Sequence, residues 1–369
     1  RRRRRHLYLL AQEARGLTSV LSVFRAWVDR YLSNEEALLL AILLALGLVI
    51  IITIGAIIAP LLTGIVFAFV LQGVIKFLTR RHMGEWAAAT LAYLLFLSVL
   101  VTSLVFVIPS VLRQLGLLFD EAPEMLARMR EILNELPQKY PNYVSEDVIT
   151  GWSEMLQGEA GNIGQWLLSA SISQLPVLVT VVVYLLLVPI LVFFFLKDKE
   201  EILRWTLSFL PKERPLLDRI GFEMNVQMAN YVRGKFLEVI IAGGATYVVF
   251  VFFDLDYAAL LGFLVGLSVI VPYVGIAVVT VPVVFIAYLQ FGFGATFAWV
   301  MLWYTLVQAL DGFVLVPVLF SEAVNLHPVA IIAAILIFGS LWGLWGVFFA
   351  IPLATLIKAI IYAWPQQGV

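Results

Sequence analysis

The chain has 369 residues, of which 62% are hydrophobic and only 13% are charged, and its mean hydropathy is +0.98. These proportions exclude an ordinary soluble domain and predict an all-α polytopic membrane protein. The formal net charge of −1 indicates little about partners, because no Lys or Arg occurs between Lys235 and Lys358. So long a stretch without a basic side chain is expected to lie in lipid or in protein interior.

Cysteine and histidine restrict the chemistry that the chain can carry out. No cysteine is present, which excludes disulfides, c-type haem and thiol catalysis, and the three histidines are too widely spaced for a zinc site. The sequence also lacks a Walker-type phosphate loop and the HExxH and GxSxG motifs. We therefore expect no metal, no cofactor and no catalytic residues, and so a protein that is not an enzyme.

The N-terminal segment, residues 1–36, is basic. Arg1–Arg5 are followed by three further arginines, a pattern typical of a cytoplasmic, partly amphipathic lead-in to a first span. Five consecutive arginines also suit nucleic-acid binding, but no folded basic module follows, so we expect no nucleic-acid partner. The first long apolar run begins near Ala37, which is too late and too long for a cleaved signal peptide.

Runs of about 20 apolar residues are long enough to cross a bilayer. Three such runs occupy residues 37–109, with Pro60 at the turn between the first two, and a fourth covers 175–196. The region 236–369 begins with a fifth run and continues almost without interruption. We therefore expect about seven or eight transmembrane helices, some of them broken or re-entrant. The individual runs are 37–59, 61–78, 86–109, 175–196, 236–253 and 257–363.

Two polar regions set the expected orientation. Residues 110–174 carry four basic and nine acidic side chains, whereas residues 197–235 carry eight basic ones. The positive-inside bias therefore places the N-terminus and 197–235 in the cytoplasm and the acidic insert outside. Within the insert, residues 118–136 have the spacing of an amphipathic helix, which we favour as an oligomer interface over a membrane-surface helix. Residues 197–235 are expected to form two short amphipathic helices separated by Pro211 and Pro215.

Glu238 is a candidate for substrate or ion binding, because an ionisable side chain at membrane depth is costly unless it serves a function or has a partner. It shares one helix face with Tyr231 and Gly234, and the small residues of that face suit close packing against another helix. Arg233 and Lys235 are also close in sequence, so a structural ion pair at the membrane boundary is an equally good interpretation.

Asp311 is the second acidic candidate. With Tyr304 and Gln308 it forms a polar stripe along one helix, which must face a cavity or another helix rather than lipid. Because no basic residue is near in sequence, Asp311 should be protonated, bound to a cation or hydrated, although a hydrogen-bonded brace between helices is the competing interpretation. Two other acids of the C-terminal half, Asp254 and Asp256, are interpreted as part of an outer turn between two apolar runs.

Prolines and glycines interrupt the C-terminal region at two places. The apolar run that starts at residue 257 is too long for one ordinary span, and Pro272, Tyr273 and Gly275 mark its expected bend. At the second place Pro317 and Pro328 flank a polar cluster. Broken helices expose carbonyls and helix ends that bind substrates and ions, so the cluster is a binding candidate, with the last two of its members also suited to cap helix ends. The members are Glu322, Asn325 and His327.

Small residues recur at helical spacing in two further segments. Gly262 and Gly266 lie on one expected face, and Gly339, Gly343 and Gly346 lie on another. Such faces allow helices to approach closely in a membrane, so we interpret them as helix-packing positions.

Five ordered blocks carry a resemblance to a known family. They are "FFFLKDKEEI" (193–202), "NYVRGKFLEVIIAG" (230–243), "YAALLGFLVGLSVIVPYVGIAVVTVP" (257–282), "LVPVLFSEAVNLHPVAI" (315–331) and "FGSLWGLWGVFFAIPLATLIK" (338–358). Together with the three-span start and the extracytoplasmic insert, they resemble the autoinducer-2 exporter family, in particular its PerM-like permease branch.

The resemblance implies a bacterial inner-membrane protein that forms homo-oligomers, possibly pentamers, and has no attached ATPase. Family members export a signalling furanone or exchange sodium or lithium for protons. Many relatives carry a small residue followed by a basic one where this chain has Ser321 and Glu322, so the substrate or coupling ion could differ. We expect a secondary transporter or exporter, an antiporter for example, of a small solute or cation, coupled to protons or sodium; the alternatives are an oligomeric passive channel and a membrane scaffold.

Overall fold

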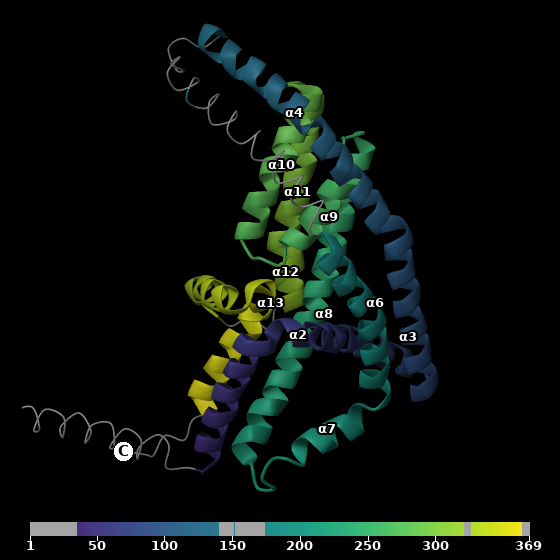
Figure 1. Cartoon of the computed structure of the whole chain (residues 1–369), viewed down its shortest axis with the longest axis vertical. Coiled ribbons are helices and arrows are strands. Elements are labelled where there is room, and N and C mark those ends of the chain that lie inside the picture. The colour runs from purple at the N-terminus through teal and green to yellow at the C-terminus, as the bar shows by residue number, and fades with distance from the viewer. Residues whose placement is uncertain (1–34, 140–150, 152–173, 321–325, 364–369) are drawn as a thin grey trace, which may run out of the picture. The chain divides into compact units, whose positions relative to one another are not determined.

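The computed structural model describes residues 35–139, 151, 174–320 and 326–363, and within these ranges the chain is helical and contains no strand (Figure 1). In the described part of the chain, seven helices are long and apolar enough to cross a membrane, and one shorter apolar helix accompanies them. The expected all-α polytopic fold is therefore confirmed. The seven spans are Leu38–Thr79, Glu85–Glu135, Val179–Lys197, Pro215–Phe252, Val274–Phe291, Ala295–Phe320 and Pro328–Tyr362.

The chain divides into two compact units, which are described separately. Unit 1 comprises Arg1–Ile58, Leu203–Met228 and Leu326–Val369, and unit 2 comprises Ala59–Ile202 and Ala229–Asn325. Many aliphatic and aromatic side chains of both units are exposed in the monomer, as expected for helices that face lipid.

Helix α2 (Glu35–Thr79) differs from the pair of spans expected for residues 37–78. Pro60 lies inside the helix, and the interruption occurs earlier, at Ile54, whose backbone angles are φ −127° and ψ 15°. Proline is tolerated in membrane helices because neighbouring groups compensate for the lost hydrogen bond, so a proline in the sequence does not fix the position of a turn.

Helix α13 (Pro328–Ala363), in unit 1, is interrupted at Gly343, which has φ 59° and ψ −137°. Only glycine adopts such a conformation without strain. The two arms approach closely beside this bend, since a Cβ atom on Gly346 would overlap the carbonyl oxygen of Phe338. The sequence spacing predicted that Gly339, Gly343 and Gly346 line one continuous helix face. Instead, the helix is interrupted at Gly343, and these glycines permit a tight bend.

The basic region 197–235 contains one short helix and the start of a long one. Helix α7 (Lys199–Leu207) is followed by α8 (Pro215–Phe252), which continues without interruption into the apolar run expected at residues 236–253. Arg214 precedes α8 and is bonded to Asp218 in its first turn (Nε to Oδ1, 2.9 Å). The expected second amphipathic helix is thus the first part of α8, because Pro215 suits the first turn of a helix and does not end it.

Helices α3 (Glu85–Thr102) and α4 (Ile108–Lys139) are continuous through a five-residue π-helical segment, η1 (Ser103–Val107). The helix that contains the expected run 86–109 therefore does not end near residue 109. The amphipathic 118–136 stretch is the later part of α4. Helix α6 (Gln174–Lys197) packs against α3, where the Tyr93 hydroxyl donates a hydrogen bond to the carbonyl of Pro189 (3.2 Å).

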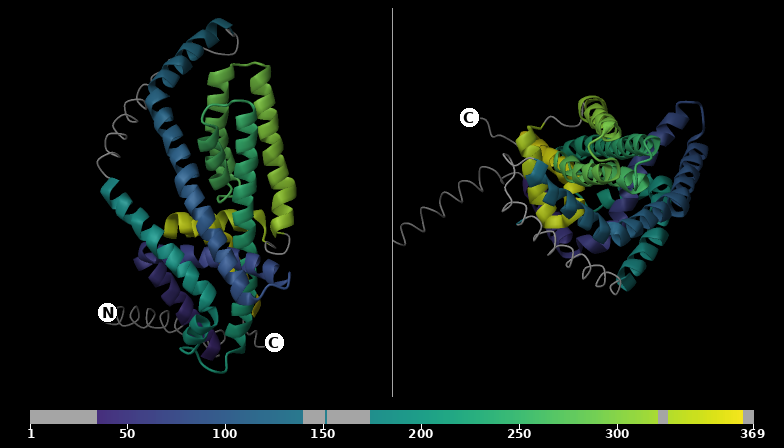
Figure 2. Two further views of the ribbon diagram at one scale, coloured as in Figure 1. Left: turned by 90° about the vertical axis from the view of Figure 1, so that its right-hand side faces the viewer. Right: turned by 90° about the horizontal axis from the view of Figure 1, so that it is seen from above.

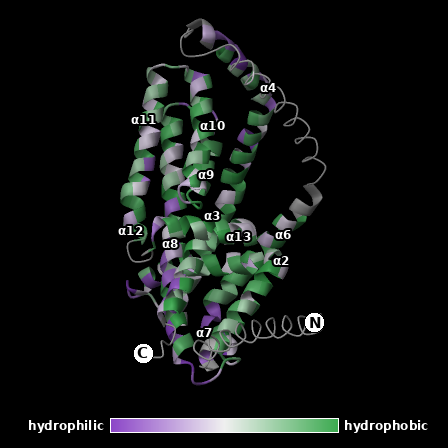
Figure 3. Ribbon diagram, turned by 90° about the vertical axis from the view of Figure 1, so that its left-hand side faces the viewer, coloured by the Kyte–Doolittle hydropathy of each residue, from purple (hydrophilic) through white to green (hydrophobic). Residues whose placement is uncertain are grey.

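The main core of unit 2 is built around a hairpin of α9 (Ala258–Ser268) and α10 (Val274–Phe291), with α11 (Ala295–Leu310) beside α10. Figure 2 shows α10 and α11 as neighbouring rods joined at one end by a short loop. The π-helical segment η2 (Asp311–Leu315) and α12 (Val316–Phe320) continue α11. In Figure 3 most residues of these helices have the colour of hydrophobic residues. The fully buried aliphatic residues of the core include Leu261, Val265, Val283, Ala287 and Val300.

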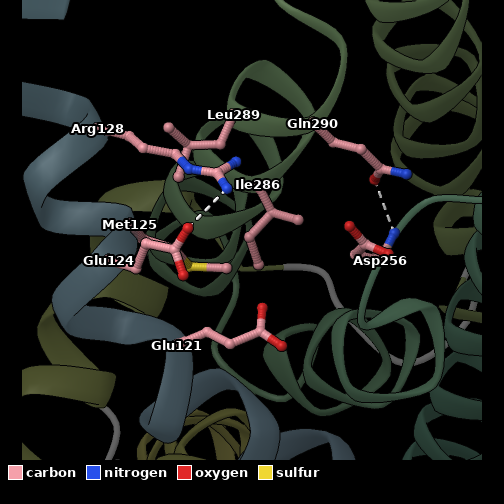
Figure 4. A pocket seen from close by; sticks show the side chains of 8 residues that line it. All are labelled: Glu121, Glu124, Met125, Arg128, Asp256, Ile286, Leu289 and Gln290. Carbon is pink, nitrogen blue, oxygen red and sulfur yellow. Dashed lines mark hydrogen bonds and ion pairs between the residues drawn. The ribbon is translucent and has the colours of Figure 1, made fainter. Parts of the chain in front are cut away.

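A polar cluster joins α4 to the turn between α8 and α9. Tyr257 donates a hydrogen bond to Glu121 (2.6 Å), the Asp256 amide donates to Gln290 Oε1 (2.8 Å), and Gln290 Nε2 donates to the Asp254 carbonyl (2.7 Å). Figure 4 shows Glu121, Asp256 and Gln290 around a cavity of about 90 Å³. The segment containing Asp254 and Asp256 is therefore a turn, as the sequence indicated.

Helices α8 and α9 approach most closely at their glycines. A Cβ atom on Gly266 would lie 2.9 Å from the carbonyl oxygen of Val239 and 3.2 Å from the Cα atom of Gly243. Backbone atoms thus occupy the space that any larger residue would need. This contact is the small-residue packing that Gly262 and Gly266 suggested.

We predict that Gly266→Ala lowers the free energy of unfolding by about 1–3 kcal/mol, because α8 and α9 must separate to accommodate the methyl group. Thermal unfolding in detergent, followed by intrinsic fluorescence, measures the effect. Gly244→Ala on α8 is the matched control, since a Cβ atom there meets nothing within 4 Å. Equal stability of the two variants would contradict the close-packing argument.

We also predict that acidification stabilises the turn beside α4. Desolvation raises the pKa of Asp256 above its ordinary value, and the nearby Glu121 charge raises it further. For an acid with a raised folded-state pKa, the favourable contribution is present at low pH and is lost as pH rises through that pKa. Amide hydrogen exchange of residues 254–260, corrected for intrinsic rates, should slow modestly on acidification. Asp256→Asn should remove this dependence; an unchanged pH response would assign it to another group.

Candidate functional site

A buried ion pair forms the centre of the candidate site. On α8, Lys235 Nζ lies 2.6 Å from Glu238 Oε2, and the two side chains are only 5% and 4% exposed. The three-residue spacing puts both on neighbouring positions of one helix face. Tyr231 and Ala242, each 2% exposed, cover this face on either side along the helix. The sequence-predicted face is therefore buried, and its carboxylate has a cationic partner.

The end of α9 supplies a further partner for Lys235. Its ammonium group donates a hydrogen bond to the carbonyl of Val269 (2.8 Å), which is free to accept because α9 ends at Ser268. The ring of Phe320 at the end of α12 lies across the same ammonium group, with its centroid 5.2 Å from Nζ. Gly234 leaves space for that ring, since a Cβ atom there would lie 2.8 Å from it.

Asp311 lies at the junction of α11 and the π-helical segment η2 and is only 4% exposed. Its Oδ1 atom is buried and has no hydrogen-bond partner among the described residues. Isolated π-helical turns within α-helices occur often at functional sites, because the wider turn changes the direction of side chains and backbone groups. The π-helical segment thus begins at the one acid of this helix.

The three charges of the site do not balance. Asp311 and Glu238 interact electrostatically, and Lys235 interacts with both, but only Glu238 lies within ion-pair distance of the ammonium group. With all three groups ionised, the cluster carries one negative charge in excess. A desolvated carboxylate without a counter-charge is costly. The arrangement therefore suits a proton or a monovalent cation at Asp311.

A second polar group lies on the same helix as Asp311. The Tyr304 hydroxyl lies 2.7 Å from the Thr280 hydroxyl of α10, and Tyr304 is 2% exposed. The Gln308 amide lies near Tyr304, but its buried atoms make no hydrogen bond of good geometry. Tyr304 therefore braces α11 against α10, whereas Gln308 and Asp311 keep unused hydrogen-bonding capacity.

The structure thus brings Glu238 and Asp311 together and puts Gln308 one helical turn before Asp311. Pro272 and Tyr273 lie in the break between α9 and α10, where Tyr273 has φ 64°, and Gly275 is the second residue of α10. The break therefore ends at Tyr273, and α10 begins at Val274. Its functional contribution to the site is the carbonyl of Val269, at the start of the same interruption.

The other expected break is described only in part. Pro317 lies within α12, and Pro328 is the first residue of α13. His327, in unit 1, is exposed, and its Nδ1 accepts a hydrogen bond from the Val329 amide (3.3 Å). His327 thus caps the start of α13 by accepting a hydrogen bond from a backbone amide. Glu322 and Asn325 lie outside the described residues.

Lys235 belongs to the cluster of Glu238 and Asp311, although the sequence pattern did not predict it as a binding candidate. Its position three residues before Glu238 indicated only a structural ion pair at the membrane boundary. The 122-residue gap in basic residues that follows is a signal that Lys235 is the last available cation for the acids beyond it. No cluster of three or more His, Asp or Glu that could hold a metal ion occurs in the ranges that the structure covers.

We predict that Lys235→Met lowers the free energy of unfolding by about 3–5 kcal/mol, because it leaves the buried Glu238 carboxylate without its partner. The double variant Lys235→Met/Glu238→Gln should recover part of this loss, since no unpaired charge remains at that position. Chemical or thermal unfolding in detergent measures both variants. If the double variant is no more stable than the single one, the pairing does not dominate the energetics of this face.

The sequence is similar to transport proteins of several organisms. Residues 38–366 match the family described as "AI-2E family transporter". The chain is 43% identical over 347 residues to "Putative permease PerM" of Escherichia coli strain K12, covering 94% of this chain and 98% of that protein. It is 25% identical over 308 residues to "Putative transport protein YueF" of Bacillus subtilis strain 168, covering 81% and 82%. With its seven apolar helices, the chain belongs to the AI-2E family of multi-pass membrane transporters.

Proposed function

We propose that the protein is a secondary transporter that couples the movement of a small organic solute or cation to protons or sodium. The observation that carries this proposal is Asp311, a buried carboxylate within a span. Among the described residues its Oδ1 has no hydrogen-bond partner, and no cation lies within ion-pair distance of it. Such a group binds a proton or a cation reversibly, which is the chemistry that ion coupling requires.

The same cluster supplies the second element of a coupled site. Glu238 is held by Lys235, and Lys235 is held by the Val269 carbonyl at a helix end. Helix ends and unwound backbone near the middle of a span bind substrates and ions in secondary transporters. Neutralisation of Asp311 changes the electrostatic potential at this ion pair. Binding of a proton or cation to Asp311 therefore affects the interaction between Lys235 and Glu238.

A passive channel and a scaffold are the competing functions. A channel needs a continuous polar lining. A cavity that lies beside Asp311, between α8 and α11–α12, is instead lined almost entirely by aliphatic residues. A scaffold does not need an unpaired buried carboxylate. We further propose that the protein lies in a bacterial inner membrane with a cytoplasmic N-terminus and forms homo-oligomers, pentamers being the expectation from the family.

We predict that purified protein in proteoliposomes exchanges protons for sodium or a small organic solute, and that Asp311→Asn reduces this flux to that of empty vesicles. Glu238→Gln should also impair it, because the ion-pair geometry changes. A pH-sensitive dye trapped in the vesicles measures proton movement after the solute is added. Asp254→Asn makes the same chemical change in an exposed turn and should retain wild-type flux.

Each alternative gives a different result. Wild-type rates for both Asp311→Asn and Glu238→Gln would remove the coupling role from this cluster. A steady, ohmic conductance that does not respond to a proton gradient would favour a channel. Absence of flux for every solute, together with reproducible capture of another protein by the full chain, would favour a scaffold.

A further inference from the structure

A cavity of unit 2 opens beside Asp311. It has a volume of about 330 Å³ and lies between α8 and the continuous segment formed by α11, η2 and α12. This volume is at the lower end of the range for small-molecule sites. Asp311 is the one ionisable residue in its wall. The other lining residues are Ile241, Ala242, Ala245, Val307, Leu310, Val314, Leu315 and Val318.

The wall of this cavity offers few ligands to a bare metal cation. Sodium, like other hard cations, requires several oxygen ligands to replace its hydration shell. Here the wall offers the carboxylate of Asp311 and aliphatic side chains. A sodium ion at Asp311 would therefore have to keep most of its water inside an apolar cavity, which is unfavourable.

A neutral polyhydroxylated solute fits equally badly. Each hydroxyl group transferred from water needs a hydrogen-bond partner, and an unpaired one costs about 1–3 kcal/mol. The aliphatic wall can satisfy one such group, at Asp311, and no more. A ligand with one polar end and an apolar body has no such penalty, because the wall takes the apolar part out of water.

The charge of the cluster determines the sign of the polar end. Lys235 compensates Glu238, from which it lies 2.6 Å, and Asp311 retains one uncompensated negative charge with a buried, unpartnered Oδ1. Among the described residues, the ionisable groups that interact with Asp311 are Lys235 and Glu238, and the lining residues of the cavity include no other titratable group. An ammonium group in the cavity provides the charge that compensates Asp311.

We propose that the cavity between α8 and α11–α12 binds a monovalent organic cation with an apolar body, whose ammonium group pairs with Asp311. This assignment rests on the proposed transport function and names the class of its substrate. The proton and the organic cation compete for the same carboxylate, so one displaces the other. Because each carries one positive charge, exchange of one for one is electroneutral.

The test uses 2-phenylethylammonium as the probe and 2-phenylethanol as its neutral counterpart. Isothermal titration of the full-length protein in detergent, in buffers of different ionisation enthalpy, measures affinity and the protons released on binding. We expect saturable binding of the cation with release of protons at acidic pH. Asp311→Asn should weaken binding at least tenfold, or about 1.4 kcal/mol, and abolish proton release.

Two variants test the position of the apolar body. Ala245→Phe puts a ring into the cavity and should abolish binding of the cation. Ile240→Phe is the matched control, because this residue is 52% exposed on the other side of α8 and does not line the cavity; it should bind normally. Size-exclusion profiles identify any variant that fails to fold, and in that case Ala245→Leu provides a smaller obstruction with the same expected loss of affinity.

Other outcomes separate this inference from the transport function. Equal affinity for 2-phenylethanol, or wild-type affinity in Asp311→Asn, would overturn the pairing of an ammonium group with Asp311. Sodium-driven proton flux that depends on Asp311, without any binding of 2-phenylethylammonium, would overturn the ligand class while supporting coupled transport. Binding with proton release but no flux of the probe or any other solute would support the ligand class and overturn the transport function.

Discussion

The ion pair between Lys235 and Glu238 is the interaction on which the rest of the site depends. Lys235 pairs with Glu238 at 2.6 Å and donates a hydrogen bond to the Val269 carbonyl. Its charge and two of its donors are therefore used by these two groups. Asp311 is thereby left with an uncompensated charge in a buried position. Without Lys235 the two acids would repel each other in an apolar environment, which would destabilise the folded site unless one of them took up a proton.

Helix interruptions provide the groups that surround this pair. The end of α9 frees the Val269 carbonyl, and the π-helical segment η2 begins at Asp311. The same helices are otherwise closely packed, at Gly266 on Gly243 and at Tyr304 on Thr280. Regular helices keep the backbones in place, and the interruptions in them leave polar backbone atoms free to interact with side chains. Irregular backbone is tolerated at membrane depth where it is buried in protein in this way.

Composition and apolar run length were sufficient to predict the fold class, because a chain in lipid must satisfy its backbone hydrogen bonds within helices. They could not predict that α2 passes through Pro60, or that α13 bends at Gly343, since such bends depend on tertiary contacts. Helical spacing correctly placed Glu238 and Asp311 on buried faces. The pairing with Lys235 was visible only as an alternative, because sequence distance does not reveal depth.

The two walls of the cavity beside Asp311 differ in how closely they are packed. Its α8 wall is continuous with the contact between Gly243 and Gly266, where backbone atoms leave no room for displacement toward α9. The opposite wall ends in α12, whose residue Val318 is 70% exposed and whose contact with the site is the Phe320 ring over Lys235. The described contacts therefore hold α8 more tightly than α12, and Phe320 is the side chain through which α12 contacts the ammonium group.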